Sequence, residues 1–164
     1  MEIPDSIIDY YLNPGDFYFG GPNIRIRTLL GSCVSIILWN PEAKLGGMCH
    51  YILPLQNGNF RDSTLNGKYG EDAISLFLKE IKTKRLDPKS FKARIFGGSN
   101  MFLTHEKELL DDKLAGQIGS RNSDFAINEL KKLGIKILSK DIGGIQSRKI
   151  YFSVWDGEVW VEKK

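Results

Sequence analysis

The sequence predicts an α+β fold: a single domain of mostly antiparallel β-sheet or sandwich layers, with two main helices packed on them. Three observations lead to this prediction. Short apolar or alternating runs mark about seven or eight strands, and many of these strands follow one another directly. Two segments carry helical periodicity. The 164 residues suffice to bury one hydrophobic core without disulfides or metal.

Predicted strands dominate the first third of the chain. Residues 1–12 are a mixed lead-in, and residues 13–16 have the sequence Asn-Pro-Gly-Asp, which predicts a turn. Residues 24–29 alternate apolar and polar side chains, as a half-buried strand does. Residues 34–39 are rich in β-branched and aromatic side chains, and residues 45–53 return as a second apolar strand. We therefore expect three successive strands here.

A first helix is predicted after residues 54–68, a polar segment rich in Asn and Gly that we expect to be a loop. Apolar side chains then recur at the i, i+3, i+4 and i+7 spacing of one helical face, over about four turns: Ile74, Phe77, Leu78 and Ile81. Asp87-Pro88 is expected to stop this helix.

The second helix is predicted to begin well after the next strand. Residues 91–96 predict that strand, and the charged residues 104–117 are assigned to no element. Asn122 or Ser123 can cap a helix whose first following residue is Gly134.

The chain is predicted to finish with strands. Residues 135–139 predict one, and residues 148–155 and 158–162 predict two more. Asp156-Gly157 joins the last two, and this dipeptide is preferred in two-residue type I′ hairpin loops.

The charge balance is that of an ordinary globular protein. Lys and Arg number 23 against 20 Asp and Glu, and the cations are scattered among the acids. This argues against nucleic-acid binding. No apolar run reaches membrane-spanning length, and the first residues lack the apolar stretch of a signal peptide. Two cysteines make no disulfide framework, so we expect a cytoplasmic protein without membrane insertion.

The strongest chemical signal is a cysteine at a turn, followed by a histidine on the next strand. Cys33 directly follows Gly31-Ser32, where a thiol is exposed, and His50 lies on the next apolar strand. A cysteine nucleophile needs such a base. Its tetrahedral oxyanion needs fixed donors, for which the backbone N–H groups of Ser32 and Cys33 are candidates. The pattern therefore provides the minimal apparatus of a cysteine nucleophile with its base.

Other interpretations of these residues stay open. A buried free cysteine is a common core residue, so Cys33 alone need not be catalytic. Cys49 is adjacent to His50, and adjacent strand residues face opposite sides, so Cys49 is expected in the core unless a bulge re-aims it. His105 competes as the base from a charged segment. A zinc site from both cysteines and both histidines lacks closely spaced ligand pairs, and we expect no metal.

Five short motifs follow one another along the chain. Residues 28–34 have the pattern T-x2-G-S-C-V, and residues 47–54 have G-x2-H-Y-x-L-P. The others are F-G-G-S-N-M-F at 96–102, I-G-S-R-N at 118–122 and D-I-G-G-x3-R at 141–148. In this order they resemble the CheD family of chemoreceptor glutamine deamidases, over residues 13–161. Ser99 and Ser147 stand where that family usually has Ala and Gly.

The resemblance implies hydrolysis of a receptor glutamine side chain to glutamate through a thioester, with release of ammonia and without a cofactor. It assigns Cys33 as the nucleophile, His50 as the base and Thr28 as a supporting hydroxyl. We expect the substrate to contact a wider set of residues: Gly31, Ser32, Gly97, Gly98, Met101 and Phe102. Residues 1–164 would then form one CheD-like deamidase domain.

The partners that the resemblance implies are the cytoplasmic domains of chemoreceptors and a CheC-type phosphatase. An alternative is a non-catalytic docking module that binds receptors or such a phosphatase. The pair Cys33 and His50 favours the enzyme, because docking needs neither a thiol nor an imidazole. A cysteine peptidase or another amidase would use the same chemistry with a different pocket.

Overall fold

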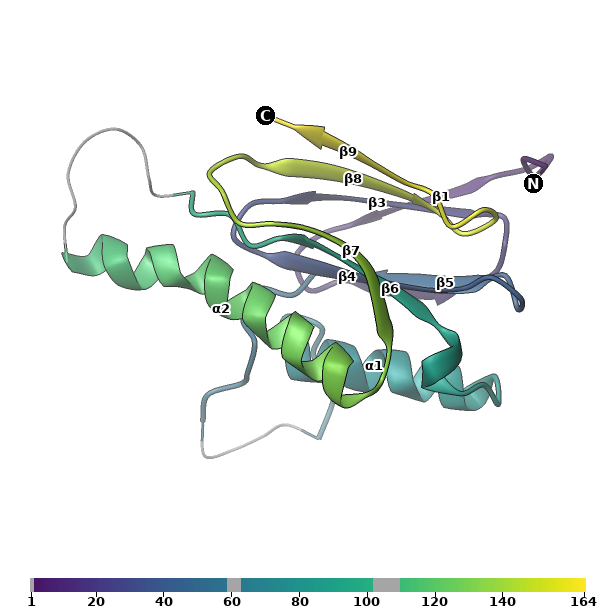
Figure 1. Cartoon of the computed structure of the whole chain (residues 1–164), viewed down its shortest axis with the longest axis horizontal. Helices are drawn as coiled ribbons and strands as arrows, with labels where there is room; N and C mark the ends of the chain where they lie inside the picture. Colours follow the sequence, from purple (N-terminus) through teal and green to yellow (C-terminus); the bar gives the residue numbers. More distant parts are fainter. Residues whose placement is uncertain (1, 59–62, 102–109) are drawn as a thin grey trace.

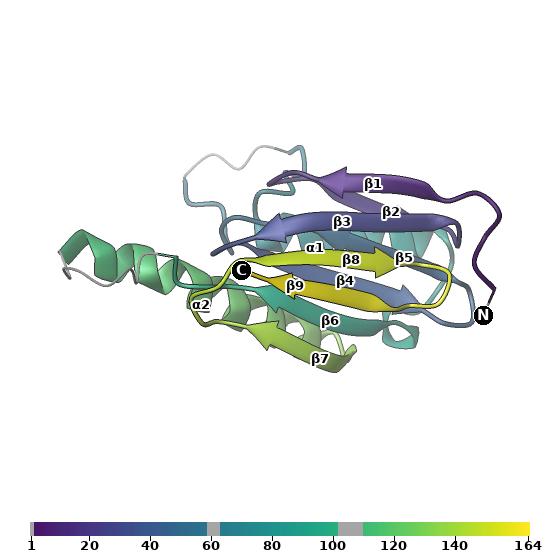
Figure 2. The same cartoon turned by 90° about the horizontal axis from the view of Figure 1, so that it is seen from above.

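The computed structural model describes residues 2–58, 63–101 and 110–164, and it has three layers (Figure 1). A four-stranded sheet packs face to face on a five-stranded sheet, and two helices cover the other face of the five-stranded sheet. Figure 2 looks onto the four-stranded sheet, with the second sheet and the helices behind it. The predicted α+β class is confirmed.

Nine strands form these sheets within the described residues, where the sequence predicted seven or eight. The four-stranded sheet contains, in order across it, β1 (Ile8–Leu12), β3 (Ile24–Leu30), β8 (Arg148–Ser153) and β9 (Val159–Lys163). The five-stranded sheet contains β2 (Phe17–Gly20), β5 (Leu45–Cys49), β4 (Val34–Asn40), β6 (Lys92–Gly97) and β7 (Lys136–Ile142). The pairs β1–β3 and β6–β7 are parallel and the other five are antiparallel. The mostly antiparallel prediction therefore holds.

Both predicted helices exist, but the second begins earlier than expected. Helix α1 (Gly70–Thr83) buries Ile74, Phe77 and Ile81 against the sheet, as the spacing predicted, and η1 (Pro88–Ser90) is a short 3-10 turn after it. Helix α2 spans Leu110–Lys132. A helix start at Asn122 or Ser123 is therefore wrong. The first half of α2 is charged and glycine-containing, so it shows no apolar stripe.

Two connections also differ from prediction. β5 ends at Cys49 because the next residue, His50, pairs its backbone with the segment before β2. The loop between β8 and β9 is not a type I′ turn, which needs positive φ at both central residues. Gly157 has a φ of 74°, whereas the φ of Asp156 is not positive. The loop is longer because Val154 and Trp155 before it are buried core residues.

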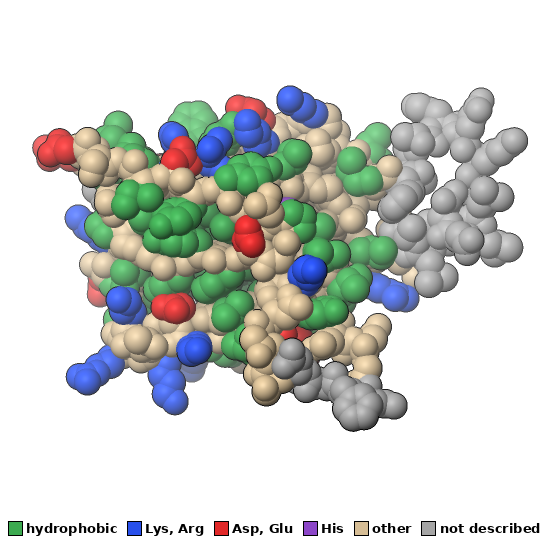
Figure 3. All heavy atoms as spheres, turned by 180° about the vertical axis from the view of Figure 1, so that it is seen from behind, with side chains coloured by type: hydrophobic (Ala, Val, Ile, Leu, Met, Phe, Trp, Pro, Cys, Tyr) green, Lys and Arg blue, Asp and Glu red, His purple; other side chains and the backbone are tan. Residues whose placement is uncertain are grey.

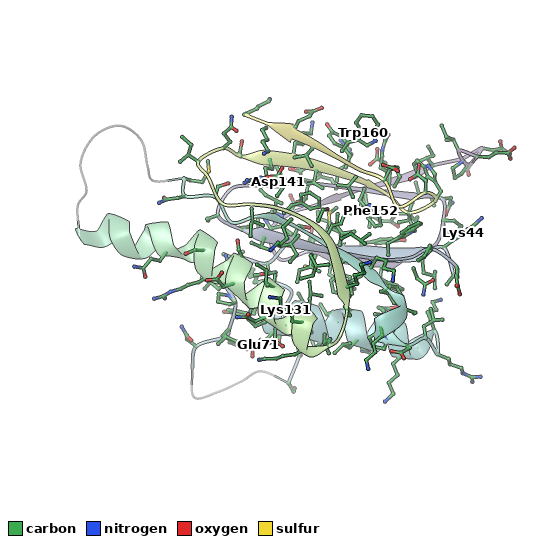
Figure 4. All side chains as sticks on the ribbon, in the orientation of Figure 1. Lys44, Glu71, Lys131, Asp141, Phe152 and Trp160 are labelled. Atoms are coloured by element: carbon green, nitrogen blue, oxygen red, sulfur yellow. The ribbon has the colours of Figure 1, made fainter. Side chains whose placement is uncertain are left out.

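The core has one part on each face of the five-stranded sheet. Figure 4 shows Phe152 between the two sheets, whereas Trp160 projects outward from the four-stranded sheet and is 71% exposed. Apolar side chains also gather over the face that carries the edge strands β1 and β2 (Figure 3). There Tyr10 stacks on Tyr18, with ring centroids 4.0 Å apart, which joins the edges of the two sheets. No helix among the described residues is long and apolar enough to cross a membrane.

Candidate active site

The turn that carries Cys33 joins β3 to β4, and its carbonyl groups are held by two other segments. Three successive carbonyl oxygens accept hydrogen bonds: Gly31 O from the Ser99 N–H (3.0 Å), Ser32 O from the Asn122 side-chain amide (3.1 Å) and Cys33 O from the Gly98 N–H (2.9 Å). Because every carbonyl is fixed, the orientation of each peptide group in the turn is fixed as well.

The N–H groups of the same turn remain available. Among the described residues, none accepts a hydrogen bond from the backbone N–H of Ser32, and the N–H of Cys33 donates to no other residue. Cys33 itself is half-buried. The turn therefore presents two backbone N–H donors, those of Ser32 and Cys33, next to the thiol, as an oxyanion site requires.

Gly97 and Gly98 lie directly behind this turn. Both are buried and have φ values of 106° and 66°. A Cβ atom on Gly97 would lie 2.2 Å from the Cys33 carbonyl oxygen, and one on Gly98 would lie 2.0 Å from Ser123 Oγ. Both glycines therefore allow the chain to pass directly behind the cysteine turn, and their contact with the substrate stays a prediction.

His50 is fixed through both its backbone and its ring. Its N–H donates to Asp16 O at 3.2 Å, and its carbonyl accepts from the Gly15 N–H at 2.7 Å. Ring atom Nδ1 lies 2.6 Å from Thr28 Oγ1, which in turn lies 2.8 Å from Leu12 O. The single hydroxyl proton of Thr28 goes to the Leu12 carbonyl, so Nδ1 carries the ring proton and donates it to Oγ1. Atom Nε2 is then unprotonated.

Cys33 and His50 lie on the same face of the five-stranded sheet. Val34 and Tyr51 exchange two backbone hydrogen bonds of 3.1 and 3.0 Å. Cys33 comes one residue before Val34 and His50 one residue before Tyr51, so both side chains lie on the face opposite to those of Val34 and Tyr51. Cys33 packs on the core between the sheets, and His50 points to the facing sheet. A hydrogen bond between the Cys33 sulfur and His50 Nε2 stays a prediction.

Both groups are neutral in the free protein near neutral pH. Burial raises the pKa of the Cys33 thiol, which its own backbone N–H partly opposes. Burial lowers the pKa of His50 to about 4, although the Asp16 carboxylate acts to raise it. These shifts do not favour the expected increase in resting thiolate. They suit a neutral imidazole that takes the thiol proton during attack.

Acid should destabilise the protein through His50. Its pKa of about 4 in the folded state lies below the ordinary 6.5, so between these values the unfolded chain binds a proton that the folded chain does not. The ring's contribution should be complete above pH 6.5 and be lost as the pH falls toward 4, by about 3 kcal/mol in all. Urea unfolding at neutral and acidic pH measures this loss. Between neutral and acidic pH, His50→Gln should lose less free energy of unfolding than the wild type. Equal losses in the two proteins would contradict a neutral buried imidazole.

Cys49 lies on the opposite face, as strand parity predicted. It is fully buried in the part of the core that packs against the helices. The Ile36 N–H lies 3.3 Å from its sulfur, and burial raises its pKa to about 12. A thiol in these surroundings is unreactive.

Iodoacetamide should therefore modify Cys33 and leave Cys49 unmodified in the folded protein. Cys49→Ala should lower the free energy of unfolding by about 1 kcal/mol through lost packing, and should leave the rate of Cys33 alkylation unchanged. Peptide mass mapping after limited alkylation checks both statements. Equal labelling of the two thiols would mean that the strand register is wrong.

The remaining predicted site residues are placed as follows. Met101 is 43% exposed, and its side chain lies beside Gly31. Phe102 and His105 lie outside the described residues. Within the described ranges, no group of three or more His, Cys, Asp or Glu side chains is positioned to hold a metal ion. Of the predicted substrate contacts, Gly31 and Ser32 form the turn that leads to Cys33, and Met101 lies beside Gly31.

Arg148 is bound inside the fold. Its buried guanidinium donates to Asp141 Oδ1 at 3.0 Å, to Ser99 Oγ at 2.6 Å and to Gly143 O at 2.8 Å. Ser99 Oγ also donates to Gln146 O at 2.6 Å. The hydroxyl of Ser99 thus ties the segment behind the thiol turn to the loop before β8. Arg148 therefore pairs with a carboxylate inside the fold.

Arg121 is exposed and lines a hollow of about 450 Å³. Most of the other lining residues are apolar: Leu53, Pro54, Leu55, Ile118 and Phe125. The hollow lies between the segment that follows the His50 strand and helix α2.

Asn122 is the site residue whose part sequence reasoning missed. It lies in the middle of α2, is 0% exposed, and its side chain reaches the cysteine turn. Apolar periodicity gives no signal for such a residue, since a polar side chain before an apolar run is typical of a helix cap. The signal that was present is the I-G-S-R-N motif, which ends at this residue.

Comparisons with known proteins show which family this chain resembles. A family model described as "CheD chemotactic sensory transduction" matches residues 52–163. A "Probable chemoreceptor glutamine deamidase CheD 1" of Leptospira interrogans is 45% identical over 161 residues, which are 98% of this chain and 95% of the relative. A protein of the same description from Chromobacterium violaceum is 46% identical over 153 residues, 93% of this chain and 76% of the relative. These alignments are long enough to include most of the chain before residue 52.

A more distant relative and one solved structure complete the comparison. The "Probable chemoreceptor glutamine deamidase CheD" of Pseudomonas syringae pv. tomato is 32% identical over 162 residues, 99% of this chain and 93% of the relative. A crystal structure from Neisseria meningitidis superposes with a TM-score of 0.45 and 9% identity, over 79% of this chain and 54% of that one, which is too weak to inform fold or function. With a family match over more than half its length and several near full-length relatives, this chain belongs to the CheD family.

Proposed function

We propose that this protein is a chemoreceptor glutamine deamidase, with Cys33 as the nucleophile, His50 as the general base and Thr28 as the hydroxyl that orients the base. One observation carries the assignment of roles. The hydrogen-bond chain from Leu12 O through Thr28 Oγ1 to His50 Nδ1 leaves Nε2 unprotonated on the face of the sheet that holds Cys33. The names of the curated relatives supply the substrate class.

Acylation begins as His50 Nε2 accepts the thiol proton and the Cys33 sulfur bonds to the side-chain carbonyl carbon of the glutamine. The negative charge moves to the carbonyl oxygen, where the backbone N–H groups of Ser32 and Cys33 stabilise it. The C–N bond then breaks, and the leaving nitrogen takes the proton back from Nε2 and departs as ammonia. A thioester to Cys33 remains.

Deacylation repeats these steps with water. His50 Nε2 takes a proton from water as the water oxygen bonds to the thioester carbon. The N–H groups of Ser32 and Cys33 hold the new oxyanion. The C–S bond breaks, the sulfur regains a proton from Nε2, and glutamate is released. Throughout, Thr28 keeps the proton of His50 on Nδ1, so Nε2 alone exchanges protons with the reacting groups.

The proposal includes the finer assignments that rest on the resemblance. Residues 1–164 form one deamidase domain that works in the cytoplasm, where it meets the cytoplasmic domains of chemoreceptors. A CheC-type phosphatase is a second partner. Neither nucleic acid nor a cofactor takes part. The exposed Met101 beside the thiol turn supports a protein contact at this end of the molecule.

The proposal is tested by incubating the protein with a recombinant cytoplasmic fragment of a chemoreceptor and mapping the peptides by mass spectrometry. Conversion of specific glutamines to glutamates, with an equal amount of ammonia, is expected. Cleavage of the receptor backbone would indicate a peptidase instead. Binding of the fragment without any conversion would support a docking module.

A further inference from the structure

The strands that carry the nucleophile and the base separate directly after their last shared rung. Val34 and Tyr51 form that rung with two backbone hydrogen bonds. In a regular antiparallel pair the next rung would join Ser32 to Leu53. Instead, the Leu53 N–H donates to Lys68 O at 3.1 Å, and the Leu53 carbonyl accepts from the Gly70 N–H at 2.8 Å. The Ser32 N–H is thereby kept out of the ladder, and the two strands are free to diverge.

The side chain of Asn122 occupies the point of divergence. Its Nδ2 donates to Ser32 O at 3.1 Å and to Ile52 O at 2.7 Å. A side-chain amide has two protons on nitrogen, and both are used, one on each strand. Ser32 directly precedes Cys33, and Ile52 lies two residues after His50. Asn122 therefore replaces the missing rung with a bridge from a third element.

Asn122 is held in this place at a cost to the helix. Asn is a weak helix former in a helix interior, and the buried Oδ1 atom of Asn122 has no hydrogen-bond partner among the described residues. The backbone carbonyl of Asn122 accepts the Tyr51 hydroxyl proton, which ties this turn of α2 to the strand that carries His50. A fully buried polar side chain with an unsatisfied oxygen is poor for stability alone. Its two amide donors account for its presence.

We infer that Asn122 is a positioning residue, which sets the distance between the Cys33 thiol and the His50 ring by clamping the carbonyls of Ser32 and Ile52. The clamp also keeps the Ser32 N–H directed away from the strand ladder. The N–H is thereby free to stabilise the oxyanion. This inference rests on the proposed function for its catalytic consequence. The geometry of the clamp does not depend on the identity of the substrate.

Two substitutions break the clamp. Asn122→Leu has a similar shape and no polar atoms, and Asn122→Asp keeps the shape but has at most one donor, from a protonated carboxyl, so it cannot bond to both carbonyls. Each should lower kcat for the receptor fragment by about 10- to 100-fold, because a displacement near 1 Å between reacting groups has an effect of that size. KM should stay within about twofold, since Asn122 is buried and contacts no substrate. Circular dichroism gives the folded fraction to which every rate is referred.

A second readout needs no deamidation. Alkylation of Cys33 at neutral pH should slow in Asn122→Leu toward the rate in His50→Ala, because the thiol loses its proton acceptor in both. Leu130→Ala is the matched control: Leu130 lies on the same helix, is fully buried, and packs in the helix-side core. It should lower the melting temperature and leave both rates unchanged per folded molecule.

The outcomes separate the inference from its alternatives. Wild-type kcat and alkylation rate in Asn122→Leu, or equal losses in Leu130→Ala, would overturn the positioning role. If neither Asn122 variant folds, Tyr51→Phe removes the bond to the Asn122 carbonyl and keeps the ring. It should lower kcat about two- to fivefold at constant KM, and an unchanged kcat would overturn the inference. Slower alkylation in Asn122→Leu, with no deamidation by the wild type, would retain the clamp and reject the proposed function.

Discussion

Cys33→Ala should abolish ammonia release from a chemoreceptor fragment and leave the fold intact. The thioester cannot form without the sulfur, so the loss should be at least about 10⁴-fold. Cys33 is half-buried on a turn whose shape is set by hydrogen bonds to its carbonyls. Its removal should therefore change the free energy of unfolding by about 1 kcal/mol or less. A coupled ammonia assay and mass mapping of receptor peptides measure the activity.

Cys49→Ala is the matched control for this variant, because it removes the other thiol from the opposite face of the sheet. It should retain deamidation. Binding of the receptor fragment to Cys33→Ala should persist, which separates docking from chemistry. If Cys33→Ala were active and Cys49→Ala inactive, the roles of the two cysteines would have to be exchanged.

His50→Ala should give the second largest effect, a loss of about 10²- to 10⁴-fold in kcat. Without the imidazole, the thiol has no acceptor for its proton, and burial keeps its pKa raised. Single-turnover measurement of ammonia release isolates acylation from the later steps. Activity near that of the wild type would mean that another group is the base.

Thr28 provides a graded control for this assignment. Thr28→Ser keeps the hydroxyl between Leu12 O and His50 Nδ1, whereas Thr28→Val removes it at similar volume. Thr28→Val should therefore lose more activity than Thr28→Ser, because Nδ1–H then has no acceptor and the buried ring can rotate or change tautomer. Equal losses would show that Thr28 contributes packing alone.

The sequence predicted the parts of the site that depend on strand periodicity. Adjacent strand residues alternate between faces, so their positions in the chain are enough to assign Cys49 and His50 to opposite sides. Cys33 and His50 belong to strands joined by a short turn, which makes their pairing a local property. The helix over Gly70–Thr83 was equally visible, because its apolar face has a regular spacing.

The parts that the sequence did not predict depend on contacts between distant segments. β1 exposes most of its side chains and shows no regular alternation, and its pairing with β3 supplies the Leu12 carbonyl that orients Thr28. The role of Asn122 follows from where α2 docks, which local periodicity does not encode. Gly97 and Gly98 were expected to allow a close approach, and the structure shows which atoms approach: the Cys33 carbonyl at Gly97 and the Ser123 hydroxyl at Gly98.

The wide sequence spacing of the residues around the thiol has a consequence for synthesis. On a ribosome, Cys33 and His50 emerge long before Asn122, and before β8, which pairs with the strand that carries Thr28. Contacts of such long range form late, because the chain entropy of closing the intervening loop must first be overcome. Until α2 docks, the turn that carries Cys33 lacks the hydrogen bond from Asn122 to the Ser32 carbonyl. The nascent chain is therefore exposed to oxidants before it is able to hydrolyse an amide, and completion of the fold both protects and activates the same sulfur atom.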